Sequence, residues 1–99
     1  MEYEKEYKIM LETWGEDSQI DICIEEMAEL TKALCKYKRL KRFNEQNQEK
    51  IKSNLENIKE EIADVLNVIH QMAYIFGENE IKDIRAEKVN RTMKKMIKN

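Results

Sequence analysis

Two short stretches of the chain repeat one pattern of acidic and apolar residues. The first is Ile24-Glu25-Glu26-Met27-Ala28-Glu29-Leu30, and the second is Lys59-Glu60-Glu61-Ile62-Ala63-Asp64-Val65-Leu66. Each stretch places two carboxylates three residues apart, and on a helix such residues project from one face, one turn from each other. The two pairs are Glu26 with Glu29 and Glu61 with Asp64. The repeat therefore predicts two helices that each present a pair of acids.

A helical wheel at about 100° per residue separates these acids from the other acids of the chain. Both helices have one apolar arc, formed by Ile20, Cys23, Ile24, Met27, Leu30, Leu34 and Tyr37 on the first and by Ile58, Ile62, Val65, Leu66, Ile69, Met72 and Phe76 on the second. Glu26 and Glu61 fall inside these arcs, and Glu29 and Asp64 fall at their edges. A carboxylate inside an apolar stripe is destabilised unless a cation compensates its charge. The shared position on both helices therefore predicts a metal cation between them.

The composition favours an all-α fold. The chain has 99 residues with no proline and only two glycines, and its charged fraction of 38% stands beside a hydrophobic fraction of 41%. Such proportions are typical of a nearly all-helical protein. A chain of this length forms one domain with a small core. We therefore predict a single domain over residues 1–99, an antiparallel helical bundle of about four helices that is completed by oligomerisation with another copy of the chain.

Charge and hydropathy restrict the partners. The formal charge of −2 provides no basic surface for general nucleic-acid binding, so no nucleic-acid partner is expected. The chain has no apolar run that could span a bilayer and no signal-peptide pattern at its start, which predicts a cytoplasmic protein without a membrane partner. Cys23 and Cys35 lie too far apart on one helix to bridge, so both are expected to be reduced thiols.

Glycines and capping residues set the predicted helix boundaries. Gly15 and Gly77 are expected to end two helices, because glycine suits the left-handed position after a helix. Ser18 is expected to cap the second helix, and Ser53 with Glu56 forms a capping box near the start of the third. The predicted helices are 2–13, about 19–42, one from near 53 or a turn or two earlier to 76, and one after 79, with a polar segment over 43–57.

Several polar residues around the acids are candidates for substrate contacts. Gln19 and Lys36 share the helix strip of Glu26 and Glu29, and Lys36 can reach a phosphate. The alternative for Lys36, which we favour, is a solvated position in the basic run that ends its helix. Asn67 follows Asp64 by three residues and can hydrogen-bond a substrate, with Gln71 a weaker candidate.

Two further candidates lie near the ends of the chain. Trp14 either anchors the first helix in the core or flanks a bound base. Lys88 and Arg91 either fold over the acids and bind phosphates or belong to a basic solvent-facing surface. His70 lies away from the acids on the wheel and is not assigned to the metal. The absence of Glu-x-x-His pairs also argues against a di-iron bundle.

Ligands that are all oxygens select hard cations, so Mg²⁺, or Mn²⁺ in its place, fits this site best. The usual partner of several Mg²⁺ ions is a polyphosphate. The ions neutralise phosphate oxygens and activate a water for in-line attack on phosphorus. A spare carboxylate at the edge of the cluster takes the proton from that water.

These residues also resemble a known family. Glu25-Glu26-x-x-Glu29 followed by Glu61-x-x-Asp64 is similar to the ExxE…ExxD signature of the MazG-like, all-α nucleoside triphosphate pyrophosphatases, which include the dimeric dUTPases. The resemblance covers most of the chain from Trp14 to Arg91. The segment between the motifs is somewhat longer than is usual for MazG itself, which leaves the subfamily and the base preference open.

The resemblance implies a hydrolase that cleaves a (d)NTP to (d)NMP and pyrophosphate with Mg²⁺. The implied metal ligands are Glu26, Glu29, Glu61 and Asp64, and Lys88 and Arg91 are the implied phosphate contacts. Family members form homodimers or homotetramers in which a neighbouring subunit helps to close the site. Two alternatives stay open: a non-enzymatic helical interaction module whose acids pair with Lys or Arg across an interface, and a member that binds nucleotides without turnover.

Overall fold

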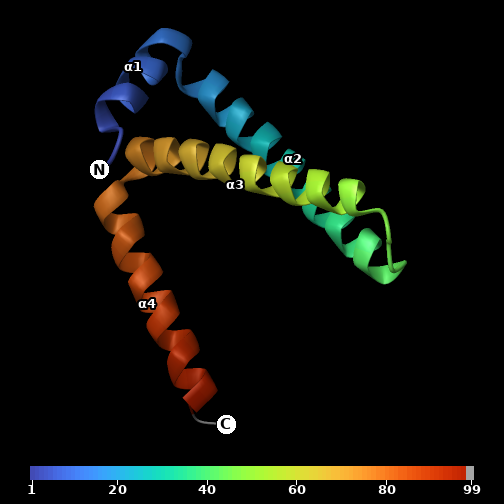
Figure 1. The fold of residues 1–99 in the computed structure, drawn as a ribbon. Helices are drawn as coiled ribbons and strands as arrows, with labels where there is room; N and C mark the ends of the chain where they lie inside the picture. Colours follow the sequence, from blue (N-terminus) through green and yellow to red (C-terminus); the bar gives the residue numbers. More distant parts are fainter. Residues whose placement is uncertain (98–99) are drawn as a thin grey trace.

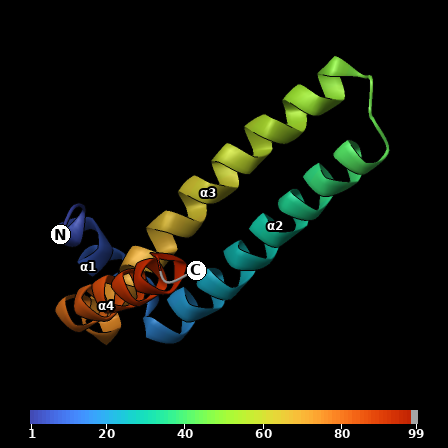
Figure 2. The same cartoon turned by 90° about the horizontal axis from the view of Figure 1, so that it is seen from below.

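The computed structural model describes residues 1–97, and this part of the chain contains α-helices and no strands. The four helices are α1 (Glu4–Trp14), α2 (Glu16–Arg42), α3 (Gln48–Phe76) and α4 (Glu78–Ile97). α2 and α3 form a long antiparallel hairpin, α1 lies at its open end, and α4 leads away from it (Figure 1; Figure 2). The prediction of an all-α fold with about four helices is confirmed.

The interface between α2 and α3 follows a heptad pattern. Side chains that alternate by three and four residues are buried or half-buried along both helices: Gln19, Cys23, Glu26, Leu30, Ala33, Tyr37 and Leu40 on α2, and Ile51, Asn54, Ile58, Glu61, Val65, Val68 and Met72 on α3. This spacing averages 3.5 residues and keeps two helices in contact along their length. We call this set the seam; it includes one acid from each predicted pair.

The seam is rotated away from the predicted apolar arcs. Part of each arc is exposed, namely Ile24, Met27 and Leu34 on α2 and Ile62, Leu66, Ile69 and Phe76 on α3. The apolar arcs therefore do not coincide with the buried interface of a single chain. The arcs on the helical wheel are defined by the largest apolar side chains. Part of the seam is instead formed by small and polar residues such as Ala33 and Asn54.

Glycine ends α1 and α3 at the positions that the sequence predicts. Gly15 and Gly77 have φ angles of 86° and 119°, a region that glycine enters without strain. Their amides donate hydrogen bonds to the carbonyls of Leu11 and Ala73, at 2.8 and 2.9 Å. These bonds satisfy acceptors that a helix end otherwise leaves unpaired.

Both predicted N-caps were wrong. α2 begins at Glu16, directly after Gly15, so Ser18 lies inside the first turn. The acids of that turn stabilise the early start, because negative charge is favourable at a helix N-terminus. α3 begins at Gln48, and the side chain of Asn47 caps it by accepting a 3.2 Å hydrogen bond from the Lys50 amide. Ser53 is therefore within the helix.

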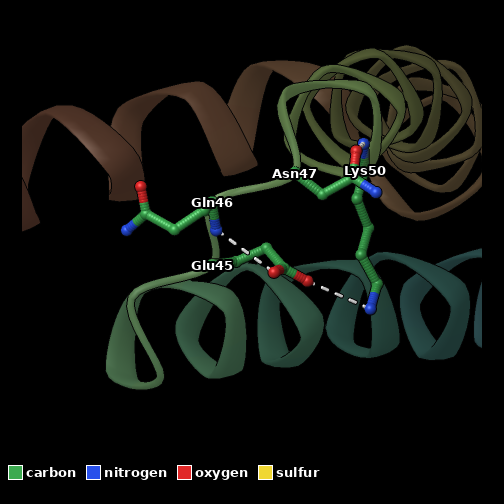
Figure 3. A network of polar contacts seen from close by, with 4 residues as sticks. All are labelled: Glu45, Gln46, Asn47 and Lys50. Carbon is green, nitrogen blue, oxygen red and sulfur yellow. Dashed lines mark hydrogen bonds and ion pairs between the residues drawn. The ribbon is translucent and has the colours of Figure 1, made fainter.

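The connection between α2 and α3 is short, over residues 43–47 rather than 43–57. Figure 3 shows its polar contacts, in which Glu45 accepts a hydrogen bond from the Gln46 amide at 3.1 Å and pairs with the Lys50 ammonium, also at 3.1 Å. Asn44 has a positive φ of 51°, which asparagine tolerates better than most residues. Together these contacts reverse the chain within one tight loop.

α4 is the least supported helix of the described chain. None of its residues is buried, and among the helices it contacts only α3. The radius of gyration is 17.4 Å, compared with about 13 Å for a compact domain of this length. The described residues are thus an open arrangement rather than a closed globule. No helix among them is long and apolar enough to cross a membrane.

Candidate metal centre

Three carboxylates meet on one face of the hairpin. Glu26 comes from α2, and Glu61 and Asp64 come from α3; each offers an oxygen that lies within 4.8 Å of the other two. We call these residues the acidic triad. Glu26 and Glu61 are half-buried and Asp64 is exposed, in line with their places inside and at the edge of the predicted arcs. Glu29 is exposed and lies outside this group.

The triad is electrostatically strained. Burial raises the pKa of Glu26 above its usual value, and the charges of Asp64 and Glu61 raise it further. Burial also raises the pKa of Glu61, followed by the charges of Asp64 and Glu29. Glu29 therefore acts on the same group of charges although it is not one of the three. The ion pair within residues 1–97 joins Glu45 of the loop to Lys50 in the first turn of α3, so no ion pair there involves the triad.

An unsatisfied oxygen points to a missing partner. Oε2 of Glu61 is buried and accepts no hydrogen bond from any described residue. A buried carboxylate oxygen without a donor or cation is destabilising. The donor set consists of carboxylate oxygens alone, which is the chemistry of Mg²⁺ or Mn²⁺ sites rather than of zinc or iron sites. The triad therefore fits a hard divalent cation.

A family comparison gives independent evidence. The model of the MazG nucleotide pyrophosphohydrolase domain matches residues 15–99, which is most of the chain. The chain belongs to the MazG nucleotide pyrophosphohydrolase family. The match includes α2, α3 and the whole triad, and it begins after α1. No match was found among curated proteins or among solved structures.

Three predicted substrate residues of this MazG domain lie along the hairpin. Gln19 is 2% exposed, and its Nε2 has no acceptor within residues 1–97. Asn67 is exposed and accepts a 3.4 Å hydrogen bond from the hydroxyl of Tyr7 on α1. Lys36 is exposed and lines a polar surface cavity of about 310 Å³ together with Ser53 and Asn57.

The structure does not bring the remaining candidates to the triad. Trp14 ends α1 with 58% of its surface exposed, so the interpretation as a core anchor was wrong. Lys88 and Arg91 are exposed on α4, which contacts α3 but not α2 and leads away from the hairpin (Figure 1). Within one chain they are therefore solvent-facing cations.

The sequence places Tyr7 on the first helix but assigns it no role in the site. This residue is 3% exposed and packs on the α3 turn that follows Asp64, where its hydroxyl reaches Asn67. Gln71, which we ranked below Asn67, is 6% exposed and sits with its Nε2 3.2 Å from the sulfur of Met10. The helical spacing of Tyr3, Tyr7 and Met10 was the available signal, but it did not indicate which element α1 would cover.

Proposed function

We propose that this MazG domain is a Mg²⁺-dependent nucleoside triphosphate pyrophosphohydrolase that cleaves a (d)NTP to (d)NMP and pyrophosphate. The observation that carries the proposal is the acidic triad with its unsatisfied Glu61 oxygen, in a chain of this family. A cluster of carboxylates without a cationic side chain is poorly suited to stabilising a fold. It is well suited to holding the cations that accompany a triphosphate.

Glu26, Glu61 and Asp64 would hold Mg²⁺, or Mn²⁺ in its place, with Glu29 at the edge of the site. When bound, the ion would neutralise phosphate oxygens and lower the pKa of the attacking water. Asp64 and Glu29 are exposed beside the half-buried pair, which suits an acceptor for the proton of that water. Lys36 supplies a positive charge farther along the hairpin for the phosphates at the leaving end.

We also propose that the working form is a homo-oligomer. The exposed apolar residues of α2 and α3 lie on one side of the seam, and Glu29 and Asp64 lie on the other. This apolar face consists of Ile24, Met27, Leu34, Leu55, Ile62, Leu66, Ile69 and Phe76. A continuous apolar surface of two helices is typical of a subunit interface. In a homodimer or homotetramer, Lys88 and Arg91 of a second copy would be the candidates for phosphate contacts, because α4 does not bring them to the triad of its own chain.

A pyrophosphate-release screen tests the reaction directly. The protein is incubated with common and damaged (d)NTPs and Mg²⁺, and pyrophosphate and orthophosphate are measured separately. We expect pyrophosphate, and we expect Glu61→Gln to lower its release at least about 100-fold, since even residues that only orient metal ligands are worth 10- to 100-fold. The matched control is Glu60→Gln, which neutralises the neighbouring exposed acid. Full activity of Glu61→Gln would contradict the proposal.

Thermal unfolding separates the enzyme from the interaction module. If the acids paired with Lys or Arg across an interface, the Glu26→Gln/Glu61→Gln variant would be destabilised and Mg²⁺ would leave the melting temperature unchanged. The raised pKa values imply the opposite result: removing two charges stabilises the metal-free protein. Mg²⁺ should raise the melting temperature of the wild type alone, because it binds the folded state preferentially. Nucleotide binding without pyrophosphate release would indicate a member without turnover.

A further inference from the structure

Another cavity lies between α1 and α3, and its lining on α3 begins at Asn67, three residues after Asp64. It has a volume of about 280 Å³ and is lined by Tyr3, Glu6, Tyr7, Met10, Asn67 and Gln71. Asn67 follows Asp64 by three residues, which is a rise of about 4.5 Å along the helix. The volume is just below the range for whole small-molecule sites, about 300 to 1,000 Å³. The cavity thus begins about one helical turn beyond Asp64 and is sized for part of a nucleotide.

The walls of this cavity are suited to a flat, partly polar ring. The buried ring of Tyr7 meets the ring of Tyr3 edge-on, with 6.3 Å between centroids and 64° between planes. Met10 adds a polarisable apolar side chain. Apolar and aromatic walls with a few polar groups are the usual lining of a ligand site. Aromatic faces in particular stack on nucleobases.

The polar groups of the cavity have unused hydrogen-bonding capacity. Gln71 is 6% exposed, yet its Oε1 is buried and receives no hydrogen bond from residues 1–97. Its Nε2 faces only the sulfur of Met10, which is a weak acceptor. The Oδ1 of Asn67 accepts a hydrogen bond from the Tyr7 hydroxyl, and this bond orients the amide. The Nδ2 of Asn67 remains a donor that this hydrogen bond does not use. Buried polar atoms without partners are rare and call for a ligand or water.

We propose that this cavity is the nucleobase subsite, in which the Gln71 Oε1 accepts a hydrogen bond from a ring N–H or exocyclic amino group of the base. The inference rests on the proposed pyrophosphohydrolase function and deepens it. The triphosphate lies over the triad, the base lies against α1, and the leaving pyrophosphate points towards Lys36. Three of the six lining residues belong to α1 and a fourth, Tyr3, directly precedes it; this segment lies before the part matched by the family model. α1 is therefore the element that sets base preference in this chain.

Binding of products tests the subsite without requiring turnover. Dissociation constants of the nucleoside 5′-monophosphates and of ribose 5-phosphate are measured by calorimetry with Mg²⁺. At least one monophosphate should bind about ten times more tightly than ribose 5-phosphate. Gln71→Met should remove this difference and leave ribose 5-phosphate binding unchanged, because a site built for a hydrogen bond discriminates strongly when the partner is lost.

The matched control is Asn54→Leu. Asn54 is another buried amide of α3 with an unsatisfied oxygen, and its Nδ2 donates to the Ala33 carbonyl near the opposite end of the hairpin. This variant should keep the full preference for the base. Circular dichroism checks that both variants are helical. In the wild type, NMR signals of the Gln71 side-chain amide should shift with the monophosphate and not with ribose 5-phosphate, which supports the subsite without any substitution.

The outcomes separate the subsite from the reaction. Equal binding of all monophosphates and ribose 5-phosphate, or an unchanged preference in Gln71→Met, would overturn the subsite. Pyrophosphate release together with either result would leave the hydrolase standing. Base-dependent binding that Gln71→Met abolishes, with no pyrophosphate released from any triphosphate, would support the subsite and contradict the hydrolase.

Discussion

The four acids ExxE…ExxD have unequal environments once the chain is folded. Glu26 and Glu61 occupy seam positions and carry raised pKa values, whereas Glu29 and Asp64 stay in contact with water. Their places on the helical wheel were enough to predict this division. A buried position is unfavourable for an ionised carboxylate. A carboxylate at such a position on each of two helices therefore indicates a cation site even without coordinates.

The residues around the triad were less predictable from sequence. Tyr7 and Asn67 are 60 positions apart, and their hydrogen bond exists only because α1 folds back over α3. Gln71 is an ordinary helix amide in the sequence and becomes a buried, half-satisfied group through the same packing. Local periodicity carries no information on such contacts, because it describes one helix at a time.

Burial of Tyr7 predicts a loss of stability in alkali. Burial raises the pKa of its hydroxyl, and the charges of Tyr3, Glu2 and Glu6 raise it further. Above about pH 10, where an unfolded tyrosine ionises, the unfolded chain has released a proton that the folded chain still holds. Stability therefore falls as the pH rises from the unfolded pKa to the folded one.

Urea unfolding of Tyr7→Phe and wild type between pH 8 and pH 11 measures this effect. The stability of the wild type should fall more steeply than that of Tyr7→Phe in the upper part of the range. Tyr37→Phe, at the loop end of the hairpin, serves as the control and should follow the wild type. Parallel curves for wild type and Tyr7→Phe would show that the hydroxyl is not buried as described.

The helix ends show which boundary signals are reliable. The predicted helix ends at Gly15 and Gly77 are confirmed. Both glycines have backbone angles that other residues adopt only with strain. The predicted N-caps at Ser18 and Ser53 were wrong. A capping residue competes with the intrinsic helix tendency of the residues before it. In both cases the helix extended towards the N-terminus until a glycine or Asn47 was reached.

Gly77→Ala is expected to destabilise the protein by about 1 kcal/mol, because alanine is disfavoured at positive φ. The contacts of an added Cβ would be ordinary, with the nearest atom 3.9 Å away on Glu80, so the cost is in the backbone alone. Chemical denaturation measures the change. Asn79→Ala, an exposed substitution two residues later, should alter stability much less. An equal effect of both variants would argue against a strained backbone at Gly77.

The hairpin seam shows why the apolar arcs of the helical wheel differ from the buried interface. Helical periodicity locates an apolar face, but it does not say whether the same chain or another copy covers that face. The true seam contains Gln19, Ala33 and Asn54, while larger residues such as Leu66 and Phe76 remain exposed. The heptad spacing of the seam was present in the sequence and was masked by these larger neighbours.

At the scale of the whole molecule, the fold class followed from composition, whereas the overall shape did not. A radius of gyration of 17.4 Å and a helix α4 without a buried residue show that residues 1–97 do not close a core alone. Buried apolar area is the main driving force for folding. The apolar face on α2 and α3 is therefore the surface from which the chain has most to gain by self-association.

Leu66→Glu tests whether a second copy covers this face. Leu66 is half exposed in one chain, so a charge there should cost the isolated hairpin little, but it would be buried without a partner in a dimer. Light scattering should give at least twice the chain mass of 11.9 kDa for the wild type and a value near 11.9 kDa for Leu66→Glu. Ala63→Glu adds the same charge on the exposed outer side of α3 and should leave the wild-type mass unchanged. If Lys88 and Arg91 on α4 of one copy contact the phosphates in another, Leu66→Glu should also lose pyrophosphate release while keeping its helicity. A fully active monomer would show instead that one chain completes the site.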